Sequence, residues 1–118
     1  MHNPAPHDKF FRHFFGNIEV ARDFLGNYLP APLLRHIDLS SLQAQADSFI
    51  DGDLKPQYTD LLFRVQMRNE NELFIYTLFE HKSYYDKNLP YQLLKYLVQI
   101  WEKYKYDGML PFVLPIVI

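Results

Sequence analysis

The 118-residue sequence contains no cysteine. This absence excludes a disulfide scaffold, a thiol nucleophile and every zinc or iron–sulfur site that is built on cysteine. The five histidines, in addition, show no spacing typical of metal ligands. The chemistry of this chain must therefore come from other residue types.

An excess of charge and a long hydrophobic run are also missing. Twelve Lys and Arg stand against fourteen Asp and Glu, a net charge of −2, so charge alone does not indicate a nucleic-acid partner. The longest apolar run, residues 109–118, is interrupted by Pro111 and Pro115 and is shorter than the roughly 18 residues that span a bilayer. The N-terminus lacks the basic-then-apolar order of a secretory signal. We expect a cytoplasmic protein without a membrane partner.

Hydrophobic residues, by contrast, make up 48% of the chain and aromatic residues 17%. That content is enough for a core, and the length suits one domain over residues 1–118. The sequence stops within an apolar stretch, residues 114–118, that is typical of a buried strand. Because termini usually lie at the surface, we expect this domain to be the N-terminal part of a longer protein.

Apolar spacing predicts an α/β fold with a mixed sheet. The expected helices cover residues 10–15, 18–28 and 90–106, with a short one over 33–37. Asn17 is placed to cap the second helix, and Asp107-Gly108 to close the long one. The expected strands cover residues 59–67, 73–82 and 112–118, after an irregular strand approach over 42–50.

The strands over 59–67 and 73–82 form a predicted hairpin that brings acidic residues together. A five-residue turn over 68–72 places Asp60 directly opposite Glu80, with Lys82 one step further on the same face. A register slip of one residue would turn one acid to the other face. Like charges opposed across a strand pair destabilise it unless something neutralises them.

Two carboxylates without a histidine or cysteine partner suit a hard cation such as Mg²⁺ or Mn²⁺. Such an ion, with a lysine beside it, supplies the parts of a metal-dependent phosphodiester hydrolase. The alternative interpretation is a surface salt-bridge cluster, because charged residues at strand ends are ordinary.

The string Thr59-Asp60-Leu61-Leu62, followed by Glu80-His81-Lys82, resembles the PD-(D/E)XK nuclease signature, with Thr59 in place of the usual proline. Further strings sharpen the resemblance: Pro6-His7-Asp8, Ala21-Arg22-Asp23-Phe24-Leu25, Tyr28-Leu29-Pro30, Ser48-Phe49-Ile50-Asp51, Leu93-Leu94-Lys95-Tyr96, Ile100-Trp101-Glu102 and Leu114-Pro115-Ile116-Val117. In this order they resemble the Rpn family of recombination-promoting nucleases, also called putative transposases (transposase-31, YhgA-like).

The resemblance implies a restriction-endonuclease-like αβββαβ core, with the chain ending in the fourth core strand, and a DNA endonuclease that uses Mg²⁺ or Mn²⁺. By position, Asp60 and Glu80 would be catalytic metal ligands and Lys82 the catalytic lysine. Gln92 and Tyr96 resemble the Gln-xxx-Tyr accessory motif of several nuclease branches, and their spacing places both on one helical face. As alternatives, Tyr96 is a packing residue and Gln92 is solvated.

The remaining candidates have simpler alternatives. Asp8 is either a further acid of the site or a helix N-cap, and Asp51 and Asp53 are either ligands or turn residues. The expected partner is DNA, with a homodimer as a further expectation. A truncated or inactive relative that only binds DNA or protein is the alternative function. Three lysines are candidates for phosphate contacts, or else form a solvated helix face: Lys95, Lys103 and Lys105.

Overall fold

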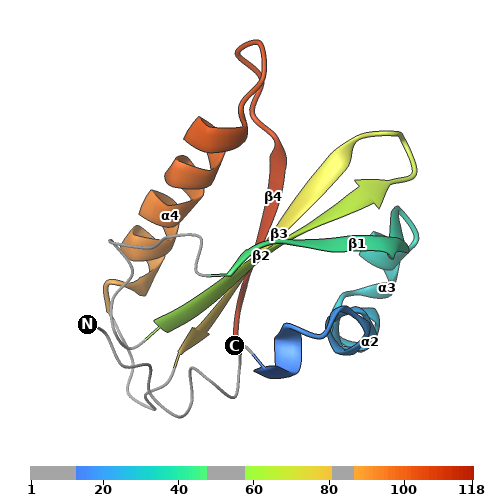
Figure 1. Ribbon diagram of the computed structural model, residues 1–118. Coiled ribbons are helices and arrows are strands. Elements are labelled where there is room, and N and C mark those ends of the chain that lie inside the picture. The colour runs from blue at the N-terminus through green and yellow to red at the C-terminus, as the bar shows by residue number, and fades with distance from the viewer. Residues whose placement is uncertain (1–12, 48–57, 81–86) are drawn as a thin grey trace.

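The computed structural model describes residues 13–47, 58–80 and 87–118 (Figure 1). In these parts of the chain the elements are α2 (Ile18–Tyr28), α3 (Ala31–Leu34), β1 (Ile37–Asp47), β2 (Tyr58–Met67), β3 (Glu72–Glu80), α4 (Leu89–Tyr104) and β4 (Phe112–Val117). The strands form one sheet in the order β1-β2-β3-β4. The β1–β2 and β2–β3 pairs are antiparallel, and β3–β4 is parallel. The predicted mixed α/β fold that ends in a fourth strand is confirmed.

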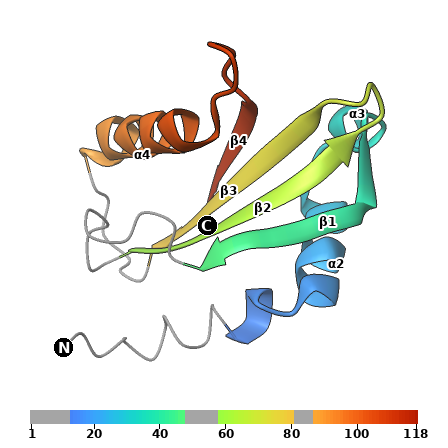
Figure 2. The ribbon, with the colours of Figure 1, turned by 45° about the horizontal axis from the view of Figure 1, so that its top comes forward.

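Helices lie on both faces of the sheet, which gives the domain three layers. Helix α4 covers one face, and α2 and α3 cover the other (Figure 2). Helix α4 also connects the parallel strands β3 and β4, as a parallel pair requires a crossover rather than a tight turn. Because strands β2 and β3 are central and covered on both faces, they are buried along most of their length.

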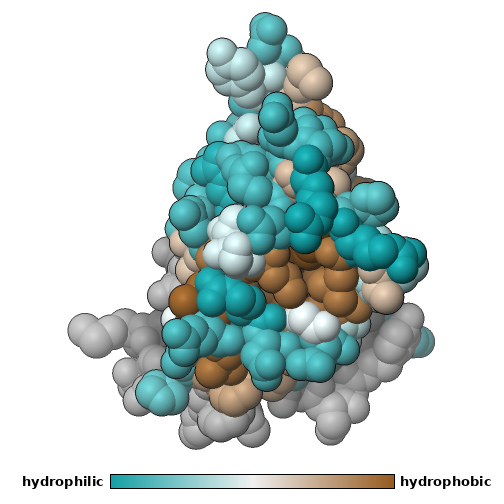
Figure 3. All heavy atoms as spheres, turned by 90° about the vertical axis from the view of Figure 1, so that its right-hand side faces the viewer, coloured by the Kyte–Doolittle hydropathy of each residue, from teal (hydrophilic) through white to brown (hydrophobic). Residues whose placement is uncertain are grey.

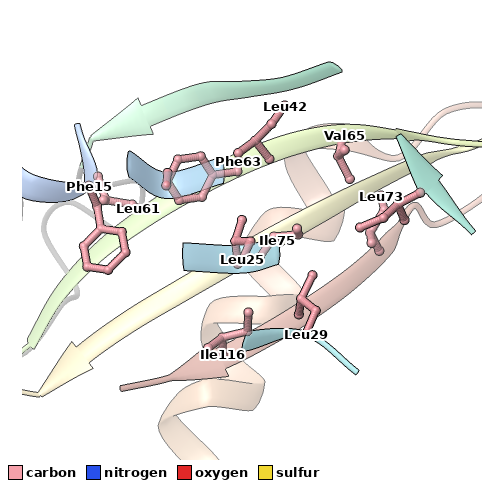
Figure 4. Close-up of a cluster of buried hydrophobic side chains, with 12 residues drawn as sticks. Phe15, Leu25, Leu29, Leu42, Leu61, Phe63, Val65, Leu73, Ile75 and Ile116 are labelled. Carbon is pink, nitrogen blue, oxygen red and sulfur yellow. The ribbon is translucent and has the colours of Figure 1, made fainter. Parts of the chain in front are cut away.

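The core on the α2 face is built from alternate residues of the central strands. Leu61, Phe63 and Val65 of β2 and Ile75 of β3 pack there against Leu25 of α2 (Figure 4). The period of two in β2 predicts this shared face, and the prediction is confirmed. The outside of this layer, on the side of β1, α2 and α3, still shows an apolar patch ringed by polar residues (Figure 3).

The second core lies between the sheet and α4. Its strand residues alternate with those of the first core, and its helix residues come from one stripe of α4. Tyr96 and Ile100 are the fully buried members of that stripe, whereas Leu93, Leu97 and Tyr104 are partly buried. This second core is the layer that contains the candidate site.

Helix α2 spans the residues that the sequence predicts, and α3 begins two residues early. The start of the helix expected over 10–15 lies outside the described residues. The Asn17 side chain accepts a hydrogen bond from the Glu19 backbone N–H at 3.0 Å, which confirms the expected cap of α2. The short helix was predicted over 33–37 but spans Ala31–Leu34, since Pro30 and Pro32 suit a helix start. Strand β1 begins at Ile37, five residues before the expected 42, and residues 48–50 lie outside the described ranges.

Helix α4 ends at Tyr104, and Asp107-Gly108 does not close it as predicted. Lys105 caps the helix through a backbone bond to Trp101. Asp107 and Gly108 have φ values of 52° and 76°, and the Tyr106 and Met109 backbones exchange hydrogen bonds of 3.0 and 2.9 Å across them. Positive φ at both central residues makes this a tight two-residue turn in the connection to β4.

The turn between β2 and β3 is shorter than predicted. The Met67 backbone N–H donates to the Asn71 carbonyl at 2.7 Å, so residues 68–70 form the loop. Glu70 closes it in the left-handed region, with φ 71°. This is the pattern of a type I turn followed by a left-handed residue. The pairing of the two strands follows from this loop and not from a turn over 68–72.

Candidate active site

Asp60 is a carboxylate in the middle layer of the protein. It lies on β2 and has no exposed surface. Its neighbours at alternate positions, Tyr58 and Leu62, belong to the core under α4, so the Asp60 side chain lies on that face of the sheet. The Tyr76 hydroxyl, from β3, donates a buried hydrogen bond of 3.0 Å to Asp60 Oδ2.

Glu80 lies on the same face, but it is not directly opposite Asp60 as predicted. Asp60 pairs with Leu78, and Glu80 pairs with Tyr58. The shorter loop shifts the register by two residues, and because side chains alternate with a period of two, this shift keeps both acids on one face. They are diagonal neighbours, a relation that puts Cα atoms about 7–8 Å apart.

The Glu80 side chain has a buried oxygen that fits a cation. Within the described residues, no hydrogen-bond donor contacts Glu80 Oε1, although this atom is shielded from solvent. A buried carboxylate oxygen costs free energy unless a donor or a cation compensates it. With Asp60 beside it, the donor set consists of carboxylate oxygens, which suit Mg²⁺ or Mn²⁺.

The described part of the chain contains no cluster of three or more histidine, aspartate or glutamate side chains able to hold a metal. A two-carboxylate site is still consistent with Mg²⁺, since this ion usually keeps several waters and takes one or two protein carboxylates. The residues present therefore fit such an ion through Asp60 and Glu80.

Tyr76 is a residue of this site that the sequence analysis missed. It has no exposed surface. Burial, and next the neighbouring Asp60 carboxylate, raise the pKa of Tyr76 well above its ordinary value. The hydroxyl is therefore neutral and acts as a donor to Asp60. A signal was available in the sequence, because strand alternation places residue 76 on the face that carries residue 80.

Helix α4 brings one of the two predicted accessory residues to the site. The Tyr96 ring is fully buried and meets the Tyr76 ring edge-on, with centroids 6.4 Å apart. Gln92 is half-buried one turn earlier on α4. Tyr96 is thus a packing residue. Its contact with Tyr76 places the helical motif beside the residue that binds Asp60.

The three predicted DNA-contacting lysines lie on the solvent-exposed surface. Lys95 lies over the Tyr91 ring, and Lys103 lies over the Tyr104 ring, each at 5.7 Å. Lys103 and Lys105 are at the C-terminal end of α4, where Tyr104 packs on Phe74 near the start of β3. They are therefore at the opposite end of β3 from Glu80, which ends that strand.

A hollow formed by the described residues also lies at that opposite end. It encloses about 490 Å³ and is lined by the β2–β3 loop, the start of β3 and the α4–β4 connection, including Arg64, Glu72, Phe74, Tyr106 and Phe112. Arg64 and Glu72 form an ion pair there, and Arg64 lies 5.7 Å above the Phe74 ring. The structure does not join this hollow to the two carboxylates.

Several predicted site residues lie outside the described ranges. These are the lysine expected beside the acids and the candidate extra acids: Lys82, Asp8, Asp51 and Asp53. Their roles stay predictions. In the described part of the chain, no helix is long and apolar enough to cross a membrane.

Comparison with known proteins identifies the family. A family model described as "Putative transposase, YhgA-like" matches residues 5–118. The comparison with solved structures gave no match.

Three relatives from Escherichia coli strain K12 illustrate that similarity. Recombination-promoting nuclease RpnA is 34% identical over 114 residues, which cover 95% of this chain and 39% of RpnA. Recombination-promoting nuclease RpnC is 36% identical over 114 residues, 95% of this chain and 38% of RpnC. A protein named "Putative inactive recombination-promoting nuclease-like protein YjiP" is 35% identical over 96 residues, 81% of this chain and 92% of YjiP. The chain thus spans about two fifths of the length of RpnA and RpnC, proteins named recombination-promoting nucleases to which it is similar. It belongs to the family described as "Putative transposase, YhgA-like".

Proposed function

We propose that this domain is the catalytic core of a metal-dependent DNA endonuclease of the recombination-promoting type. The observation that carries the proposal is a pair of carboxylates on one face of the β2–β3 hairpin: Asp60, which is buried, and Glu80, which is half-buried with its Oε1 atom shielded from solvent. The names of RpnA and RpnC support a nuclease. DNA is the substrate that agrees with a recombination-promoting role.

In this proposal Asp60 and Glu80 hold a Mg²⁺ or Mn²⁺ ion. Such an ion lowers the pKa of water and offsets negative charge on a phosphoryl oxygen. Tyr76 keeps Asp60 in place through its hydrogen bond. Lys82, two residues after Glu80, would add a positive charge next to the scissile phosphate.

The test is cleavage of supercoiled plasmid by the full-length protein with Mg²⁺ or Mn²⁺, compared with a chelator. We expect the parent to cut only with metal, and Asp60→Asn, Glu80→Gln and Lys82→Ala each to lose activity by at least about 100-fold. The matched controls are Asp23→Asn on α2 and Glu102→Gln on α4, both exposed carboxylates. If Asp60→Asn cut DNA as fast as these controls, the assignment would be wrong.

A second candidate function is a binding module without catalysis. It is favoured by the name of one relative, YjiP, which describes an inactive nuclease-like protein. The distinguishing measurement is Mn²⁺ binding by calorimetry. A folded protein that takes up no Mn²⁺ would support the binding module and contradict the nuclease.

A cytoplasmic location and a homodimer belong to the same proposal. The location follows from DNA as the substrate. The dimer follows because one centre cuts one strand, and two copies related by a two-fold axis can cut both strands of a duplex. Light scattering with and without DNA tests the dimer.

A further inference from the structure

Tyr76 occupies a central position between the sheet and α4. Its side chain is fully buried in the α4-side core. Its hydroxyl nevertheless points to a carboxylate, Asp60, and donates to Oδ2 at 3.0 Å. A core that needed only apolar volume would be satisfied by phenylalanine at this position. The hydroxyl is therefore explained by its bond to Asp60.

The hydrogen bond fixes the Asp60 side chain. A buried carboxylate can rotate about its χ angles unless partners hold it, and a hydrogen bond to a charged acceptor is among the stronger ones in a protein. Since Tyr76 and Asp60 are on adjacent strands whose pairing is continuous from Tyr58 to Gln66, both backbones are rigidly placed. The Asp60 carboxylate is therefore held on one side by the Tyr76 hydroxyl, whose strand is firmly paired with that of Asp60.

Helix α4 supports Tyr76 in turn. The Tyr96 ring packs against the Tyr76 ring at 62° between the ring planes, and Tyr96 itself is fully buried. The contact limits the movement of the phenol away from Asp60. This gives the helical tyrosine a role through Tyr76, without requiring that it reach the substrate.

We propose that Tyr76 is a positioning residue, which holds Asp60 in the orientation that binds the divalent cation, and that Tyr96 keeps Tyr76 in place. This proposal rests on the proposed function, because it assumes that Asp60 is a metal ligand. Residues that hydrogen-bond to metal ligands commonly contribute a factor of about 10 to 100 in metal affinity. Tyr76 is expected to contribute a factor in this range.

The test measures Mn²⁺ affinity by calorimetry in the full-length protein. Tyr76→Phe removes only the hydroxyl, and we expect it to weaken Mn²⁺ binding about tenfold or more. The matched control is Tyr104→Phe on the same helix stripe as Tyr96, two turns or about 12 Å along α4 and packed on Phe74. This control should bind Mn²⁺ as the parent does. Thermal unfolding in a chelator shows whether each variant is folded.

A second measurement uses the parent alone, in case Tyr76→Phe does not fold. A buried tyrosine hydroxyl that donates to a carboxylate exchanges slowly and is visible by proton NMR. Adding Mg²⁺ to saturation should shift the Tyr76 hydroxyl resonance and leave the Tyr104 ring resonances in place. An unshifted Tyr76 resonance would show that the ion does not bind the carboxylate that accepts the Tyr76 hydrogen bond.

The possible results separate the two proposals. Loss of Mn²⁺ affinity in both Asp60→Asn and Tyr76→Phe supports both. Loss in Asp60→Asn with parent-like affinity in a folded Tyr76→Phe overturns the positioning role and leaves the metal site standing. A Tyr76 hydroxyl resonance that does not shift with Mg²⁺ overturns both proposals, because the ion would then not bind the carboxylate that accepts this hydrogen bond. Parent-like affinity in Asp60→Asn overturns the metal site itself.

Discussion

Asp60 is both a carboxylate and a fully buried residue. Burying a charge costs free energy even when hydrogen bonds compensate part of it. A protein keeps such a group in its interior when it serves a function, at some loss of stability.

In a chelator, Asp60→Asn is expected to raise the free energy of unfolding by about 1 kcal/mol. The amide has the same shape, carries no charge, and its oxygen can still accept the hydrogen bond from Tyr76. Urea unfolding monitored by circular dichroism measures the change, with the exposed Asp23→Asn as the control. A loss of stability by 2 kcal/mol or more would show that the charge itself holds the core together.

The raised pKa of Tyr76 predicts how the stability of the domain depends on pH in the alkaline range. Its pKa is raised by burial and then by Asp60, so the folded protein keeps the phenol proton that the unfolded chain loses above about pH 10, the ordinary value for tyrosine. The stabilisation is complete below that pH and is lost as the pH rises beyond it.

For each pH unit above 10, the parent should lose about 1.4 kcal/mol more stability than Tyr76→Phe. The other titrating groups are common to both proteins and cancel in the difference. Urea unfolding in a chelator between pH 8 and 11 checks this. Parallel curves for the two proteins would contradict it.

At the residue scale, the sequence predicts well on which face of the sheet a side chain lies. It predicts poorly which residues are paired across neighbouring strands. The shared face of Asp60 and Glu80 follows from the period of two along each strand. Their direct opposition was wrong because it depended on a loop length, and the loop ends at a glutamate in the left-handed region. Glycine or asparagine at position 70 would have signalled that loop. Glutamate gives no such signal.

The β2–β3 loop supplies a prediction at the scale of elements. Glu70 has φ 71°, a conformation that costs a residue with a Cβ atom about 1–2 kcal/mol relative to glycine. Glu70→Gly should therefore stabilise the domain by roughly 0.5–1 kcal/mol after the larger entropy of the unfolded glycine is deducted. Thermal unfolding measures the gain.

The same substitution at an exposed helical position provides the control. Glu102→Gly, near the end of α4, is expected to destabilise by up to about 1 kcal/mol, because glycine is a poor helix former. The changes in stability caused by Glu70→Gly and Glu102→Gly should therefore have opposite signs. A loss of stability in Glu70→Gly would show that the Glu70 side chain makes a favourable contribution larger than its strain.

Helix α4 shows why its side chains were only partly assigned from the sequence. The stripe of Leu93, Leu97 and Ile100 follows from helical spacing. For Tyr96 the sequence leaves packing and an accessory role as alternatives, and the structure makes it both a core residue and a neighbour of Tyr76. Spacing cannot show this double role, because it depends on which strand residue the helix meets.

At the scale of the whole molecule, the order of elements was predicted and the relation between sites was not. The spacing of apolar residues changes from helical to alternating along the chain, and this change can be recognised in the sequence. The separation of the carboxylates from Lys103 and Lys105, by contrast, follows from the direction in which α4 crosses the sheet. A DNA duplex that used both regions would have to extend along the domain.

This geometry leads to a prediction about DNA affinity that is independent of cleavage. If Lys103 and Lys105 contact phosphates, each releases about one counterion equivalent, so Lys103→Ala and Lys105→Ala should each reduce the slope of log affinity against log salt by about 0.9. Fluorescence anisotropy on a short duplex in a chelator measures this slope for the full-length protein.

Arg35→Ala is the control for this measurement, because Arg35 is an exposed cation that follows α3 on the opposite layer. It removes the same charge and should leave the slope unchanged. A net charge of −2 makes a few well-placed lysines more important than a general attraction to DNA. If all three variants lowered DNA affinity equally, this affinity would depend on the total charge of the protein. The end of α4 would then not be the DNA-binding surface.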